Sequence, residues 1–259
     1  GELIASGGED KTVKLWSSAT GELILSLESH NTTVEAIAFT PDGQLLISGD
    51  KSGIIKLWSL PNGELLTTVQ DFSGWTTCLA VSTDGTFFAS GGIDAINLWS
   101  LPDGKLQNII STNGLVSAIV LSPDNQTLIG ASSQVNIWNI AGENESQTAW
   151  LEDSYNAFRT LAISSDGKLL VGGLGEPFVV MWSLEDNSLL NFIDVSLGTD
   201  EYYLTGIASV VISPDGHLLV SGASDNTIKL WSLPEATYIK DLIDIAASLP
   251  DFEGTLYSP

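Results

Sequence analysis

The sequence predicts an all-β repeat fold, because one tryptophan-containing segment returns at a nearly regular interval. The segment reads Leu-Trp-Ser or a close variant, and its copies lie 43 residues apart on average. A period of about 20–50 residues is typical of repeat architectures. Each copy also contains four short apolar runs separated by turn residues, which predicts a β-propeller with four strands per blade. The repeated tryptophans are Trp16, Trp58, Trp99, Trp138, Trp182 and Trp231.

The second repeat shows the unit most clearly. Its strands are expected at 34–39, 45–48, 54–58 and 64–69. Pro41 and Gly43 suit the tight turn after the first strand, and the third strand ends at Trp58. Applied to the whole chain, this pattern predicts six blades, with three strands in the first and four in each of the others.

The two ends of the chain depart from the pattern. Glu2 already reads as the middle of a repeat and the single methionine is Met181, so we expect a fragment of a longer protein. We assign residues 1–243 to the propeller, with its last strand at 237–243, and 244–259 to an irregular tail. The innermost strand of blade one should be absent or irregular, with a loose seam between Gly1 and the tail. This leaves room for a seventh blade upstream.

Composition and charge narrow the classes of partner. Of 259 residues, 43% are hydrophobic and 16% charged, which indicates a well-buried globule. Nine basic and 32 acidic residues give a net charge of −23, and such a surface repels nucleic acids and anionic membranes. A protein or peptide partner, with basic character favoured, fits this charge. No apolar run approaches the ~20 residues that span a bilayer, so a soluble protein is expected, with the cytoplasm favoured.

Two stretches resemble a known family signature. Residues 6–16 and 221–231 both read Ser-Gly-x-x-Asp-x-x-[Val/Ile]-Lys-Leu-Trp. This motif is similar to the central signature of the WD40 family, and the resemblance extends over almost the whole chain. The Leu-Trp-Ser-Leu-Pro-Asn-Gly style of the turns resembles bacterial, notably cyanobacterial, members. The resemblance implies a WD40 β-propeller that serves as a docking platform, although one fold hosts many functions.

The resemblance also implies a stabilising tetrad of Asp, His, Ser and Trp in each blade, and we expect no blade here to complete it. Blade two has the histidine, but Ser52 stands at the aspartate position. Blades one and six lack a suitable histidine. Blades four and five lack the loop aspartate, so their polar networks should be the sparsest. The structural residues assigned in this way are Asp10, Trp16, His30, Ser48, Trp58, Trp99, Trp138, Trp182, Ser221, Asp225 and Trp231.

Residues that carry chemistry are few. The two histidines are His30, assigned above to a structural role, and His217, which follows a turn. Cys78 lies within a predicted strand, where a small buried apolar group is the default. The aspartates of the Pro-Asp-Gly turns are expected to bond their own turns rather than calcium. No cluster has zinc spacing, so we expect no enzyme, cofactor or metal site.

The resemblance places the loops that enter the first strand of each blade, and those between the second and third strands, on one side of the propeller, which we call the narrow face. Aromatic and acidic side chains gather in these loops, as on a surface that binds a cationic segment. An equally weighted alternative is that the rings cap the blade ends. The candidate partner-binding residues are Glu35, Asp71, Phe72, Trp75, Asp153, Tyr155, Phe158, Arg159, Tyr202 and Tyr203.

A second set of positions is expected to face the central channel. Each of blades two to six contributes one such position, the second residue of the Val-x-[small] pattern in its innermost strand. These residues either contact ligands, as in many WD40 proteins, or line a water-filled channel. They are Glu35, Thr77, Ser117, Arg159 and Ala208.

These observations favour a non-catalytic scaffold that docks protein partners on the narrow face. One alternative is a regulatory or sensor propeller in a larger signalling protein with a catalytic domain upstream. Another is a propeller enzyme, which would need histidines or carboxylates that converge in the central channel.

Overall fold

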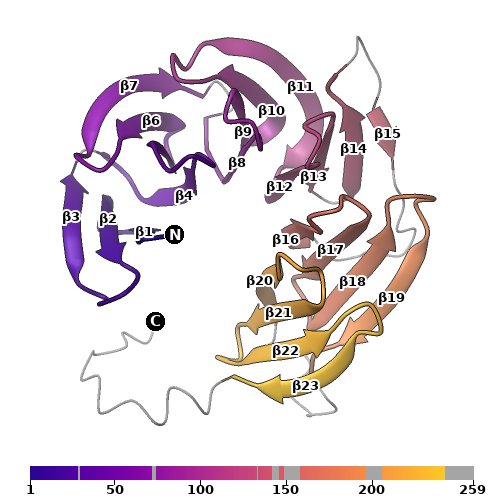
Figure 1. Cartoon of the computed structure of the whole chain (residues 1–259). Coiled ribbons are helices and arrows are strands. Elements are labelled where there is room, and N and C mark those ends of the chain that lie inside the picture. The colour runs from indigo at the N-terminus through magenta and orange to yellow at the C-terminus, as the bar shows by residue number, and fades with distance from the viewer. Residues whose placement is uncertain are drawn as a thin grey trace.

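The blades follow one another along an arc around a common centre (Figure 1). The computed structural model describes residues 1–28, 30–71, 74–132, 134–141, 146–148, 158–196 and 206–242. In this part of the chain, 23 strands form six antiparallel sheets. Blade one has three strands and each of the other five has four, as the sequence predicts.

The strands succeed one another within each blade in chain order. Blades one to three contain β1 (Leu3–Gly7), β2 (Thr12–Ser17), β3 (Leu23–Glu28), β4 (Val34–Phe39), β5 (Leu45–Asp50), β6 (Ile54–Ser59), β7 (Glu64–Gln70), β8 (Cys78–Val81), β9 (Phe87–Gly91), β10 (Ile93–Ser100) and β11 (Leu106–Leu115). Blades four to six contain β12 (Ala118–Leu121), β13 (Thr127–Ala131), β14 (Val135–Asn139), β15 (Ser146–Thr148), β16 (Phe158–Ile163), β17 (Leu169–Leu174), β18 (Phe178–Ser183), β19 (Leu189–Asp194), β20 (Ile207–Ile212), β21 (Leu218–Ala223), β22 (Ile228–Ser232) and β23 (Thr237–Asp241).

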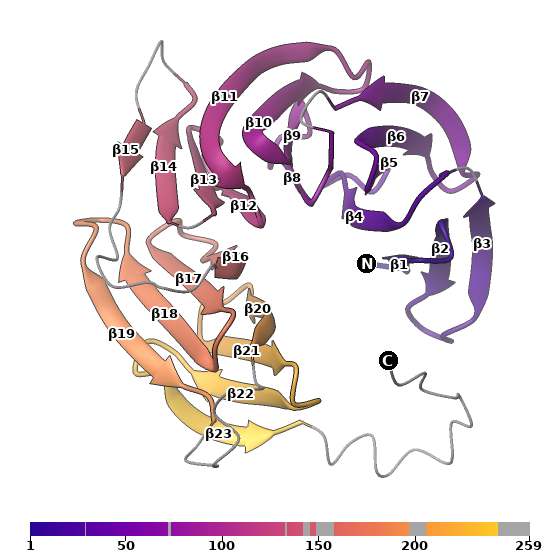
Figure 2. The ribbon, with the colours of Figure 1, turned by 180° about the vertical axis from the view of Figure 1, so that it is seen from behind.

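The first strand of each four-stranded blade lies nearest the centre and the last lies outside (Figure 2). Because the strands are antiparallel, the loops that define the narrow face lie at one end of each blade. The turns after the first and third strands lie at the other end, which we call the opposite face. The predicted bounds of β4 are reproduced, and β5 extends two residues beyond its predicted end. The last strand is shorter than predicted and ends at Asp241 rather than at 243.

Blade one lacks an inner strand among the described residues. Its sheet has the order β1-β2-β3, and no described strand pairs with the other edge of β1. Blades one and six therefore stand at the two ends of the arc (Figure 1). The described residues therefore supply three strands of blade one, the number counted from the sequence. The tail at 244–259, and with it the predicted seam, lies outside the described residues.

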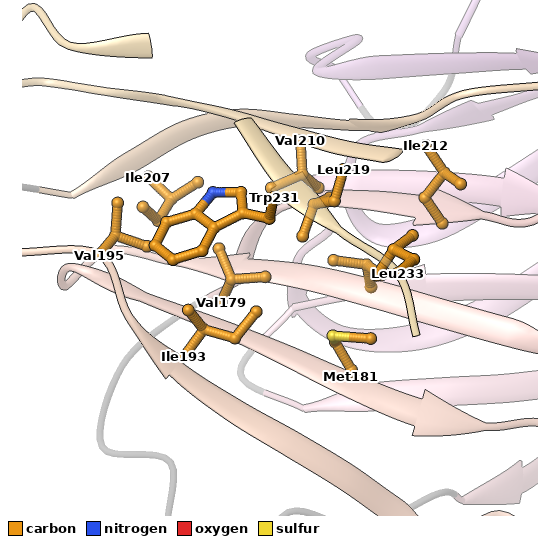
Figure 3. Close-up of a cluster of buried hydrophobic side chains, with 11 residues drawn as sticks. Val179, Met181, Ile193, Val195, Ile207, Val210, Ile212, Leu219, Trp231 and Leu233 are labelled. Carbon is orange, nitrogen blue, oxygen red and sulfur yellow. The ribbon is translucent and has the colours of Figure 1, made fainter. Parts of the chain in front are cut away.

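The hydrophobic core lies between neighbouring blades. Trp231 of blade six is 2% exposed and packs beside Val179 and Ile193 of blade five and Ile207 of its own blade (Figure 3). A similar cluster joins Trp58 of blade two to the apolar face of blade one. The repeated tryptophan thus stabilises the fold by filling the space between two sheets.

Glycines allow the blades to approach closely. A Cβ added to Gly7 would lie 2.5 Å from a methyl carbon of Val34 in the next blade, and one added to Gly173 would lie 2.5 Å from Ile207. Gly91 stands in the same relation to Val116, at 2.9 Å. Real Cβ atoms do not approach other atoms so closely, so a side chain at these positions would force the neighbouring blade to shift. The Ser-Gly pair in the repeat therefore marks where one blade packs on the next.

We expect Trp231→Ala to lower the free energy of unfolding by about 3–5 kcal/mol, because it leaves a cavity between blades five and six. Ile239→Ala in the same blade is the control, since Ile239 is 45% exposed and surface changes usually stay within about 0.5 kcal/mol. Urea unfolding of both variants measures the difference. Equal losses would contradict the assigned role of the tryptophan.

Candidate functional site

A complete Asp–His–Ser–Trp network crosses blade two. Trp58 Nε1 donates to Ser48 Oγ at 2.8 Å, and Ser48 Oγ lies 2.7 Å from His30 Nε2. His30 Nδ1 lies 2.9 Å from Asp50 Oδ2, and all four side chains are buried. The prediction that no blade completes the tetrad is therefore wrong. Asp50 supplies the carboxylate from two positions before Ser52, whose amide and hydroxyl both donate to Asp50 Oδ1.

The donors and acceptors of this network match when His30 is neutral. Ser48 Oγ accepts from Trp58, its own proton can go to His30 Nε2, and His30 Nδ1 donates to Asp50. Burial lowers the pKa of His30 from its ordinary value of 6.5, although Asp50 opposes this effect. Burial alone would raise the pKa of Asp50, but hydrogen bonds from Ser52, His30 and the amide of Ile54 outweigh it and lower that pKa.

Blade three places an aspartate where blade two has its histidine. Asp71 accepts hydrogen bonds from the Ser90 hydroxyl at 2.5 Å and from the Asn97 amide at 2.6 Å. Trp99 Nε1 donates to Ser90 Oγ at 2.9 Å. Asp71 has no exposed surface, so its assignment to the partner-binding surface is wrong. Its position 19 residues before Ser90, against 18 between His30 and Ser48, is the sequence signal that was missed.

Blades one and six carry the shorter network expected for them. Trp16 donates to Ser6 Oγ at 2.9 Å, and Trp231 donates to Ser221 Oγ at 3.0 Å. The loop aspartates pair with the lysine two residues before the tryptophan. The two pairs are Asp10 with Lys14, at 2.5 Å, and Asp225 with Lys229, at 3.6 Å.

Blades four and five have no serine for the tryptophan to bond. Trp138 and Trp182 make no hydrogen bond to another described residue, and Gly130 and Gly172 lie against their rings. In blade five the Phe158 ring lies 5.7 Å from the Trp182 ring, between centroids. Phe158 is fully buried, so its assignment to the partner-binding surface is also wrong. Apolar packing replaces the polar network in these two blades.

The predicted channel-facing residues divide into two groups. Glu35, Arg159 and Ala208 are exposed, and each lies at a register shift in the pairing of its inner strand. Thr77 and Ser117 are half-buried, and each hydroxyl donates to a carbonyl of the next blade, at Val116 and Phe158 respectively. The first group is available to a ligand, whereas the second joins neighbouring blades.

At a corner of the narrow face Lys51 lies against Trp75, near the chain segment that carries Glu35, and we call it the blade two–three corner. The Lys51 amide donates to the carbonyl of Thr33, and the Thr76 amide donates to that of Asp50, so three chain segments meet there. The Lys51 ammonium lies 5.1 Å from the centre of the half-buried Trp75 ring. The sequence pointed to Glu35 and Trp75 but not to Lys51. Phe72, Asp153, Tyr155, Tyr202 and Tyr203 lie outside the described residues.

Sequence reasoning also missed an apolar lip on the narrow face of blade three. Ile93 and Leu115 are paired at the end of the β10–β11 hairpin and are 46% and 42% exposed. The hairpin bulges at Asp94, which has a positive φ of 59° and accepts a hydrogen bond from the Gly114 amide at 2.7 Å. The available sequence signal was the presence of Asp94 and Gly114, two residue types that tolerate the positive φ found at both positions.

Other polar groups with possible chemical roles have local structural ones. In the turns of the opposite face, Asp124 accepts from the Ser122 hydroxyl and Asp166 from that of Ser164, each at 2.5 Å. Burial raises the pKa of the Cys78 thiol to about 12, which keeps it protonated. Within the described ranges, no group of three or more His, Cys, Asp or Glu residues could hold a metal ion. No helix in these ranges is long and apolar enough to cross a membrane.

Comparison with known proteins identifies the class. The family model for the WD domain, G-beta repeat, matches residues 1–17, 21–59, 63–96 and 198–232. The chain belongs to the WD40 repeat family. The unmatched stretch 97–197 contains blades four and five, where Gly130 and Gly172 replace the serine of the polar network.

Individual relatives share limited identity with the chain. It is 28% identical over 190 residues to small ribosomal subunit protein RACK1y of Oryza sativa subsp. japonica, which covers 70% of this chain and 44% of that protein. It is 27% identical over 191 residues to RACK1 of Drosophila melanogaster, covering 70% and 47%. Nuclear distribution protein PAC1 of Coprinopsis cinerea is 50% identical over 44 residues, 17% of this chain and 10% of that protein. The chain spans less than half the length of each, and these eukaryotic relatives do not support the bacterial resemblance.

We expect the blade two network to make stability depend on pH. Because the folded pKa of His30 lies below its ordinary value of 6.5, the unfolded state binds more protons, and stability falls as pH drops below that value. His30→Gln should flatten this dependence, and His217→Gln should not. Urea unfolding between about pH 5 and 7.5 tests this. An unchanged slope in His30→Gln would contradict the neutral assignment.

Restoring the family serine in blade five should destabilise the protein. A Cβ added to Gly172 would lie 2.9 Å from the Phe158 ring and 3.1 Å from the Trp182 ring, so Gly172→Ser should cost about 1–3 kcal/mol by overpacking. Gly222→Ser in blade six is the control, because an added Cβ there meets its nearest atom at 4.0 Å. Thermal unfolding compares the two, and a stabilised Gly172→Ser variant would refute the apolar account of blade five.

Proposed function

We propose that this chain is a non-catalytic protein-interaction scaffold that docks a basic or amphipathic partner segment on the narrow face. Membership of the WD40 family and similarity to the RACK1 and PAC1 proteins support an interaction scaffold in general terms. The choice of face and of partner chemistry is our own inference.

The state of the reactive side chains supports a binding role. His30, Asp50 and Asp71 are buried in hydrogen-bonded networks, and Cys78 is held as a thiol. General acid–base or nucleophilic catalysis needs such groups to reach a substrate. In the described part of the chain, these groups instead hold the blades together.

The observation that carries the proposal is the blade two–three corner. The Lys51 ammonium lies over the half-buried Trp75 ring, and Glu35 is exposed two residues beyond Thr33, whose carbonyl accepts from the Lys51 amide. A tryptophan face attracts basic side chains, and an aromatic anchor with an acidic surround is typical of a binding hot spot for a basic segment. The net charge of −23 would steer such a segment toward the protein.

A labelled peptide of alternating leucine and lysine can probe this surface by fluorescence anisotropy. Trp75→Ala should weaken its binding by about 1–2 kcal/mol, and the double variant Tyr202→Ala with Tyr203→Ala by a similar amount. Glu35→Gln should weaken it less and reduce its salt dependence. Lys51→Met should strengthen it, because the substitution removes a like charge from beside Trp75.

The matched control is Glu64→Gln, an exposed glutamate at the other end of the same blade, where it pairs with Ser59. It changes net charge as Glu35→Gln does, but on the opposite face. Affinity capture of partners with the wild-type chain, followed by the same variants, extends the test to natural ligands. If Trp75→Ala and the tyrosine variant bind like wild type, the narrow face is not the site.

A further inference from the structure

On the opposite face, hydrogen bonds link the turns of some pairs of neighbouring blades but not of others. Thr83 Oγ1 of blade three donates to the carbonyl of Pro123 at 2.9 Å, and Ser165 Oγ of blade five donates to that of Pro214 at 2.8 Å. Pro123 of blade four stands at the same turn position as Thr83 and Ser165. Proline has neither a hydroxyl nor an amide hydrogen, so blade four cannot make the equivalent bond to blade five.

A cavity of about 360 Å³ lies at this unjoined step, and we call it the blade four–five cleft. Its lining includes the apolar side chains of Ile129, which is fully buried, Ile137 and Leu184. The exposed carboxylates of Asp124 and Asp166 also line it. Ligand pockets usually measure about 300–1,000 Å³, so this cleft has room for one long side chain rather than for a folded segment.

The two carboxylates have capacity for a further partner. In each, Oδ1 accepts from a turn hydroxyl and a turn amide, whereas no described residue donates to Oδ2. Hydrogen bonds from Ser122 and Ser164 lower the pKa of Asp124 and of Asp166, so both stay ionised at neutral pH. The adjacent cation, Lys168, bonds Glu185 at 2.6 Å and attracts Asp166 more weakly, without a hydrogen bond to its Oδ2.

We propose that the blade four–five cleft binds a basic side chain of a partner protein, on the face opposite to the one considered above. Its aliphatic stem lies along Ile137 and Leu184, and its cationic head meets the free oxygens of Asp124 and Asp166. The net charge of −23 favours a cationic ligand. Long basic side chains bury apolar stems in this way while their charged heads stay near water.

Methyl NMR of the whole chain with Nα-acetyl-lysine N-methylamide tests the proposal. The Ile137 and Leu184 methyl signals should shift and saturate as this probe is added. Asp124→Asn with Asp166→Asn should weaken the probe by about three- to thirtyfold, as expected for two exposed ion pairs. The norleucine analogue, which lacks the amine, should lose affinity similarly on the wild-type chain.

The control is Asp84→Asn with Asp215→Asn, which makes the same charge change in the equivalent turns of blades three and six. It should leave the probe affinity unchanged. Absence of saturable shifts, equal affinity for the norleucine analogue, or equal affinity of the two double variants would overturn the proposal. The norleucine comparison needs only wild-type protein, so it decides even if a variant fails to fold. Glu35→Gln should have no effect, which separates this site from the narrow face.

Discussion

The close contact between one blade and the next sets the geometry on which the rest of the structure depends. At each of several steps, a glycine at the end of a second strand faces an apolar or hydroxyl-bearing residue at the start of the next blade, as Gly7 faces Val34 and Gly173 faces Ile207. This approach brings the sheets close enough for the tryptophan of one blade to pack on the strands of its neighbour. The first strands of the blades are thereby held in place, and with them the exposed residues Glu35 and Arg159.

The polar networks add to this packing without being required at every blade. A buried serine, histidine or aspartate must have its hydrogen-bond partners, and blades two and three satisfy that condition with different residues, His30 and Asp71. Blade five avoids the condition, because Gly172 and Phe158 replace the polar groups with apolar contact. Repeats that share one backbone geometry can therefore differ in how they fill the same space, since each blade interacts mainly with its neighbours.

Much of the fold could be predicted from the sequence because strand periodicity and turn residues are local signals. The strand count and the bounds of β4 follow from such signals. The errors concern residues whose role depends on contacts made through space. Asp50 and Ser52 lie two positions apart in the sequence, and the path of the backbone decides which of them bonds His30. Asp71 lies in the loop before β8 and Phe158 is the first residue of β16, next to segments rich in aromatic and acidic residues, yet both side chains are buried.

The acidic residues fall into three groups, of which one is buried and the other two are exposed to a partner. Asp50 and Asp71 are inside the blades and contribute nothing to contact with a partner. The turn aspartates use one carboxylate oxygen to close their turns and stay ionised, so they maintain the negative field on the opposite face. Glu35 alone among the described channel positions combines negative charge with exposure. A field of this kind speeds association with any basic partner, whereas specificity must come from apolar and aromatic contacts. The described surface offers such contacts at Trp75, at the Ile93–Leu115 lip and in the blade four–five cleft, so these places rather than net charge should decide which basic partner is bound.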